Sequence, residues 1–168
     1  MPEVIDAIEE VVNGEIRIMP PAKAKHAHIV ARLSAALIRQ LDENLAVVWT
    51  GSFGLVIRKA PLTSRIPDIA VFKLATMNEQ DGYIHSAPQL LVEVLSPGNT
   101  RREREEKLGD YASIGVPEVW VISPEARTVE VLLLEDGRLH STQVLARGVL
   151  TPKLFPLVNV DIARIWPD

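Results

Sequence analysis

Glu93 is a carboxylate in the middle of the apolar run Leu90-Leu91-Val92-Glu93-Val94-Leu95. Apolar residues fill both alternation sets of this run, which is typical of a strand buried on both faces. An unpaired buried charge costs several kcal/mol, so the carboxylate must be paired, protonated or bound to a metal ion. Glu93 is therefore a candidate site residue. The alternative is a structural ion pair with an arginine such as Arg32.

Asp68 is the second candidate, because it follows a proline and opens the short apolar run at 69–74. Read alone, a Pro-Asp pair is equally typical of an ordinary turn. Together with Glu93 it places two carboxylates on what we expect to be neighbouring strands. Mg²⁺ typically takes one or two carboxylates and keeps water at its other positions. A bound ion can polarise a phosphate oxygen and activate a water nucleophile, so the pair predicts a Mg²⁺ or Mn²⁺ site.

Lys107 belongs to the helix expected directly after the Glu93 strand. It borders an apolar stripe and shares a side with Tyr111 and Ile114. Its stem can therefore cover apolar surface while its ammonium reaches the strand ends. By spacing alone, the more common outcome is a solvated surface lysine paired with Glu103.

Other polar residues are weaker candidates. His26 and His28 open the first long helix, where most histidines are surface residues or caps. Glu15 follows an Asn-Gly turn and is, by itself, an ordinary strand glutamate. Phosphate contacts are one interpretation of the basic residues. The glutamates interleaved at 103, 105 and 106 favour a solvated helix face equally well. The basic residues concerned are Arg58, Lys59, Arg101, Arg102 and Arg104.

The first half of the chain predicts a hairpin, a helix and several strands that would position these residues. Asn13-Gly14 separates two alternating runs, the strongest short hairpin signal. Apolar residues every fourth position predict an amphipathic helix over about 24–42. Strands are expected at 45–49, 53–59 and 69–74, and a polar loop over 75–88.

The second half of the chain predicts a strand at 89–95, a helix and further strands. Thr100 is the expected N-cap, with Glu103 at the capping-box position, and the helix runs to about Gly115. A strand follows at 118–123, and Asp136-Gly137 closes a second hairpin. The tail carries one more short strand near 157–160 and a helical turn. Interleaved helices and strands favour a mixed α+β fold, with a mixed central sheet flanked by helices and a parallel crossover over 89–122.

Composition sets the broad class of protein. The 168 residues fit one domain over 1–168 with its own core. A net charge of −4 means that any nucleic-acid contact needs a local basic patch. The absence of cysteine excludes disulfides, thiolate zinc sites and a cysteine nucleophile, and it fits a cytoplasmic protein. The acidic N-terminus does not look like a signal peptide, and no apolar window is long enough to span a membrane.

The combination of PDIAVF, then EVLSP, then a lysine and a tyrosine on one helix, then GVPEVW, resembles the Uma family of bacterial restriction-endonuclease-like proteins. NGEIRIMPP with a following histidine extends the resemblance over nearly the whole chain. The family is placed in the PD-(D/E)xK nuclease superfamily, whose core is a mixed sheet flanked by helices.

The resemblance implies roles for particular residues. Asp68 and Glu93, with the carbonyl of Val94, would hold Mg²⁺. The superfamily motif has a lysine two residues after the acidic residue, where this chain has Leu95. Lys107 on the following helix looks like its substitute, and would orient the attacking water and stabilise charge on the phosphorane-like transition state. His26 and Glu15 match residues near the family's N-terminus and would complete the metal or phosphate shell.

Two functions follow as hypotheses. The first is a Mg²⁺-dependent endonuclease that hydrolyses DNA and acts as a homodimer, because cutting both strands needs two sites. The second is a catalytically inactive nuclease fold that serves as a nucleic-acid-binding or interaction module. Metal binding discriminates between them.

Overall fold

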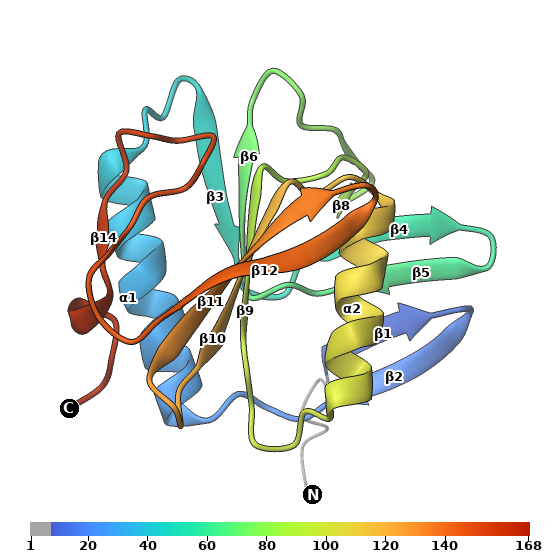
Figure 1. The fold of residues 1–168 in the computed structure, drawn as a ribbon. Coiled ribbons are helices and arrows are strands. Elements are labelled where there is room, and N and C mark those ends of the chain that lie inside the picture. The colour runs from blue at the N-terminus through green and yellow to red at the C-terminus, as the bar shows by residue number, and fades with distance from the viewer. Residues whose placement is uncertain (1–7) are drawn as a thin grey trace, which may run out of the picture.

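The computed structural model describes residues 8–168, which form two α-helices, a short 3₁₀ helix and fourteen strands (Figure 1). The expectation about a signal peptide falls partly on the first seven residues, which lie outside the described part. The helices are α1 (Ala24–Gln40) and α2 (Arg101–Ser113). Neither described helix has the length and hydropathy that a membrane-crossing helix needs.

The central sheet has six strands in the order β12-β11-β10-β9-β6-β3. It is mixed, because β9 and β10 run parallel while β6 is antiparallel to both β9 and β3. The fold class predicted from the sequence is thereby confirmed. Its strands are β3 (Ala46–Thr50), β6 (Ile69–Lys73), β9 (Leu90–Val94), β10 (Glu118–Ser123), β11 (Thr128–Glu135) and β12 (Arg138–Leu145).

A second six-stranded sheet has the order β2-β1-β5-β4-β8-β7. It projects beside α2, on the opposite side of the central sheet from α1 (Figure 1). Its strands are β1 (Ile8–Val12), β2 (Glu15–Met19), β4 (Gly54–Lys59), β5 (Leu62–Arg65), β7 (Glu79–Gln80) and β8 (Tyr83–Ile84). Near the C-terminus, β13 (Val149–Leu150) pairs with β14 (Val160–Asp161), and the 3₁₀ helix η1 (Ile162–Arg164) follows.

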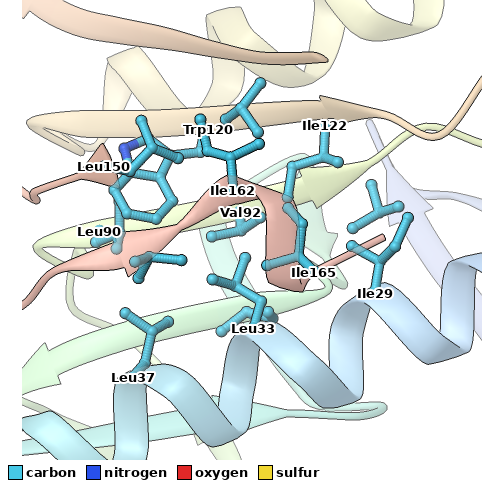
Figure 2. Close-up of a cluster of buried hydrophobic side chains, with 14 of the residues drawn as sticks. Ile29, Leu33, Leu37, Leu90, Val92, Trp120, Ile122, Leu150, Ile162 and Ile165 are labelled. Atoms are coloured by element: carbon cyan, nitrogen blue, oxygen red, sulfur yellow. The ribbon is translucent and has the colours of Figure 1, made fainter. Parts of the chain in front are cut away.

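Apolar side chains cover both faces of the central sheet. On one face, the apolar stripe of α1 and the C-terminal segment pack over β6, β9 and β10, as Figure 2 shows for Leu33, Val92 and Trp120. On the other face, Tyr111 of α2 packs over the alternate residues of the same strands, including Leu91. This two-sided burial explains why the β9 sequence is apolar in both alternation sets.

Both hairpins form where the turn residues predict them. Asn13 and Gly14 have φ of 53° and 82°, and Asp136 and Gly137 have 49° and 75°. Two consecutive residues with positive φ are the requirement of a tight hairpin turn, which explains the Asn-Gly and Asp-Gly choices. The Thr100 capping box with Glu103 also forms as predicted.

Some elements differ from the sequence-based expectation. The segment at 75–88, expected to be a loop, contains β7 and β8, each only two residues long. The sequence does not predict strand β5, because its residues Thr63, Ser64 and Arg65 are polar yet buried. Strands β3 and β4 are consecutive in the chain but belong to different sheets. Short or polar strands give little periodicity, so their pairing depends on distant partners.

Candidate active site

Asp68 and Glu93 face each other across two neighbouring strands. In the antiparallel pairing of β6 and β9, Ile69 lies opposite Val92. Extending this register by one residue places Asp68 opposite Glu93. Oδ2 of Asp68 accepts a hydrogen bond from the backbone N–H of Val94 at 2.7 Å, which fixes the aspartate against the end of β9. Two carboxylates directly opposite each other repel, so this arrangement favours a bound cation.

His26 comes to the same place from the first turn of α1. Its Nε2 lies 3.1 Å from Oδ1 of Asp68. The hydrogen bond to Asp68 raises the pKa of His26 despite the opposing effect of burial, and the Val94 backbone contributes in the same direction. The imidazole therefore holds the orientation of Asp68, whose second oxygen is held by Val94.

Glu93 is nearly buried, with 14% of its side chain exposed. Its Oε1 accepts a hydrogen bond from the Tyr111 hydroxyl, and its Oε2 lies 3.5 Å from Nζ of Lys107. Burial raises the pKa of Glu93 to about 7, and the charge of Asp68 adds to this, while Lys107 and the Tyr111 hydrogen bond oppose it. A nearby cation would stabilise the charged form of such a buried carboxylate and lower its pKa.

Lys107 is drawn inward from α2, with 16% of its side chain exposed. Its Nζ lies 3.1 Å from Oε1 of Glu10 and 3.5 Å from Oε2 of Glu93. Burial opposes its charge, but these carboxylates outweigh that effect and raise the pKa of Lys107. The lysine is therefore an ammonium ion, which can stabilise negative charge and donate hydrogen bonds but cannot accept a proton.

Glu10 on β1 is the second carboxylate that contacts the Lys107 ammonium. Only 2% of the Glu10 side chain is exposed, and it accepts hydrogen bonds from Arg65 at 3.1 Å and from the backbone N–H of Ile66 at 3.0 Å. Arg65 is equally buried, and its Nε donates to Asp110 at 2.8 Å. A chain of buried ion pairs thus connects α2, β5 and β1 and fixes the ammonium beside Glu93.

The carboxylates fit a divalent cation by their chemistry. Each carboxylate oxygen has more than one lone-pair direction, so the hydrogen bonds already made leave acceptor capacity. Mg²⁺ is usually held by one or two carboxylates with water at the remaining positions. Two opposed carboxylates at the end of a strand pair match that requirement.

Comparison with known proteins places the chain in a family. The family model described as "Putative restriction endonuclease", Uma2, matches residues 5–163, nearly the whole chain. This protein belongs to the Uma2 family. Restriction-endonuclease-like proteins of this kind generally use a divalent metal ion. No curated protein shows significant sequence similarity to the chain.

A solved structure shares the fold of this Uma2 protein. It is the crystal structure of "a putative nuclease belonging to DUF820" from Anabaena variabilis ATCC 29413. The two chains are 20% identical and superpose with a TM-score of 0.78, covering 98% of this chain and 92% of the other. This likeness shows that the Uma2 chain has a nuclease-like fold.

The structure brings together four of the five side chains proposed from the sequence of this Uma2 protein. Asp68, Glu93, Lys107 and His26 form one cluster. Glu15 does not join it, because it is exposed at the turn end of β2, where it pairs with Val12.

Glu10 takes the place expected of Glu15. It shares a strand face with Ile8 and buried Val12, and this alternation is the signal that could have identified it. Only four residues lie between the two glutamates in the sequence, but β1 lies between β2 and β5 while β2 forms the edge of the sheet.

Two alternative interpretations of the charged residues are wrong. Arg32 is exposed on α1, and the partners of Glu93 are Tyr111 and Lys107. Glu103 caps its own helix through Thr100 and does not pair with Lys107. Lys107 is therefore part of the cluster and not a solvated surface lysine.

Replacing Tyr111 by phenylalanine is expected to move metal binding to higher pH. The Tyr111 hydrogen bond lowers the pKa of Glu93, so its loss should raise that pKa above about 7. The free energy of unfolding should fall by about 1–3 kcal/mol, because a hydrogen bond to a charged group is lost. Calorimetric titration with Mn²⁺ across a pH series measures the first effect, with exposed Tyr83→Phe as the matched control. An unchanged pH dependence would show that Tyr111 does not act on Glu93.

Proposed function

We propose that this protein is a metal-dependent endonuclease that hydrolyses DNA phosphodiester bonds. The observation that carries the proposal is the register of β6 and β9. This register places Asp68 opposite Glu93, and Glu93 in turn contacts the Lys107 ammonium. Membership of the restriction-endonuclease-like Uma2 family supports the choice of a phosphodiester as the bond that is cut.

Asp68 and Glu93 would hold the ion, which we propose to be Mg²⁺ or Mn²⁺, together with the Val94 carbonyl. When bound, the ion would polarise the phosphate and lower the pKa of a water molecule. His26 keeps Asp68 in place through the bond to Oδ1.

Lys107 supplies the charge that the standard motif would place two residues after Glu93. Its ammonium stabilises the negative charge that develops on the phosphate oxygens as water attacks and one P–O ester bond breaks. Because Glu10 and the Arg65 network fix Lys107 before substrate arrives, this stabilisation requires little reorganisation.

Cleavage of supercoiled plasmid tests the proposal. The wild-type protein should cut with Mg²⁺ or Mn²⁺ and stop on addition of EDTA, whereas Asp68→Asn should cut at least about 100 times more slowly because an ion ligand is lost. Asp168→Asn, the same change at an exposed C-terminal residue, should cut like wild type. Equal cleavage by wild type and Asp68→Asn would refute the assignment of the site.

The form of the cleaved plasmid also indicates the oligomeric state of the protein. We expect a homodimer with two sites, which would convert plasmid directly to the linear form, whereas a single site would accumulate nicked circles. Binding of DNA without cleavage under any metal condition would favour the alternative of a catalytically inactive binding module.

A further inference from the structure

A groove of about 290 Å³ adjoins the candidate active site. Three segments line it: the start of α1, the loop that follows β9 and the turn that follows β10. All three lie at the same end of the molecule in Figure 1. The lining residues that matter here are Lys23, Lys25, His26, Leu95, Pro97, Pro124 and Glu125.

The groove and the carboxylate cluster are continuous. His26 lines the groove and also bonds to Asp68 at 3.1 Å. Leu95, on the groove wall, follows Glu93 by two residues on the same segment. When a phosphate of a DNA strand lies at the carboxylates, the nucleotide on one side of that phosphate is therefore at the entrance of the groove.

The chemistry of the lining matches a nucleotide. Leu95, Pro97 and Pro124 give apolar surface suited to a sugar or the face of a base. Lys23 and Lys25 are exposed at the rim and carry the positive charge that a phosphate needs. Glu125 also lines the groove, and its negative charge repels a phosphate, so we expect the phosphate on the side of the two lysines.

Lys23 and Lys25 differ from three arginines near the site, which are held in ion pairs. Arg101 pairs with Glu105, Arg104 with Glu130, and Arg58 with Asp110. Among the ion pairs formed within residues 8–168, none involves Lys23 or Lys25. In a chain with a net charge of −4, two available lysines beside the site form the local basic patch that a polyanion requires.

We propose that this groove binds one nucleotide of the substrate DNA strand, immediately beside the phosphodiester that is cut. The inference rests on the proposed nuclease function and adds the path that the DNA strand takes across the protein. The strand runs from the Asp68–Glu93 pair past His26, with its flanking phosphate on Lys23 and Lys25.

Binding of a fluorescent DNA duplex to full-length Asp68→Asn protein, followed by anisotropy over a salt series, tests this placement without cleavage of the probe. Adding Lys25→Ala should weaken binding about 3–10-fold and reduce the slope of log K against log salt by about 0.9, the value for one lost phosphate contact. Arg39→Ala is the matched control, because Arg39 is exposed on the same helix about 20 Å along its axis. It should leave the affinity within about twofold and the salt slope unchanged.

Glu125→Gln provides a change of the opposite sign. Removing this negative charge from the groove should tighten DNA binding about twofold, with no effect of Glu135→Gln, an exposed glutamate on β11. In the active protein, Lys25→Ala should raise KM and leave kcat within about twofold, because the lysine binds a flanking phosphate in the ground state and the transition state alike.

Equal effects of Lys25→Ala and Arg39→Ala, or no effect of either, would overturn the groove assignment. If wild-type protein still cuts plasmid in that case, the proposed function stands and only the groove is wrong. If the protein neither binds nor cuts DNA, the proposed function falls and the groove assignment with it.

Discussion

Lys107→Met should reduce the rate of DNA cleavage by at least about 100-fold, the typical effect of removing one preorganised charge from a developing oxyanion. Methionine keeps most of the apolar stem that packs along α2 and removes the ammonium. In the structure that ammonium lies between Glu10 and Glu93. Because its pKa is raised, the lysine acts as a fixed positive charge and not as a base.

The same substitution should not abolish metal binding. Removing the ammonium raises the pKa of Glu93 further, because the Lys107 charge lowers it. At a pH well above that raised value, where Glu93 is ionised, a divalent ion should bind Lys107→Met at least as tightly as wild type, because the competing positive charge is gone. The expected signature is therefore a large fall in kcat with Mn²⁺ affinity retained. Plasmid cleavage and Mn²⁺ calorimetry on the same preparation measure the two quantities.

Lys59→Met is the control, because Lys59 is exposed at the end of β4. It should leave cleavage unchanged. If Lys107→Met cuts at the wild-type rate, the lysine only stabilises the fold. In that case the thermal midpoint would fall while kcat stays constant.

Glu93→Gln should remove both the Glu93 contribution to the pH dependence of stability and the stabilisation by metal. The folded state raises the pKa of Glu93 from 4.5 to about 7, chiefly through burial. A group whose pKa is raised on folding stabilises the protein below its unfolded pKa, and that stabilisation is lost as the pH rises through the folded value. The metal-free wild type should therefore lose stability between pH 4.5 and about 7.

Divalent metal should act in the opposite direction. Above pH 7 Glu93 is ionised, so Mg²⁺ or Mn²⁺ at about 100 times Kd should add about 2.7 kcal/mol, or roughly 5–10 °C in Tm. Glutamine should abolish this increase, because it cannot supply the charge. Thermal unfolding at several pH values, with and without metal, measures both effects.

Glu118→Gln is a demanding control, because Glu118 is also a buried glutamate whose pKa is raised by burial. It lies on β10 and bonds to Trp120 and the Lys153 backbone, away from Asp68. This control should alter pH-dependent stability but keep the metal effect. If Glu93→Gln retains the full metal-dependent increase in Tm, Glu93 is not a ligand.

The sequence identified the two carboxylates because their signals are local. A charge between Val92 and Val94 is conspicuous in any apolar strand, and the proline before Asp68 marks a strand start. That they lie opposite each other could not be read from the sequence, because the register depends on how β6 and β9 pair, and Ile69 and its partner Val92 are 23 positions apart in the chain.

The partners of Lys107 and the place of Glu10 in the site could not be predicted from the local sequence. Spacing on the helix favoured a pair with Glu103, yet the capping box holds Glu103 and leaves Lys107 to Glu10 and Glu93. Glu10 reaches the site because β1 pairs with β5, which brings in Arg65. Strand β5 is polar and short, so its sequence gives little sign of that pairing.

The proposed mechanism requires that Asp68 and Glu93 share one divalent ion. A crystal soaked in Mn²⁺ at a pH above 7 tests it most directly, because the anomalous signal locates the ion independently of any activity. We expect one strong peak within bonding distance of both carboxylates, at about 2.0–2.3 Å from an oxygen of each. A peak elsewhere, or none at this pair in crystals of protein that cuts DNA in solution, would contradict it.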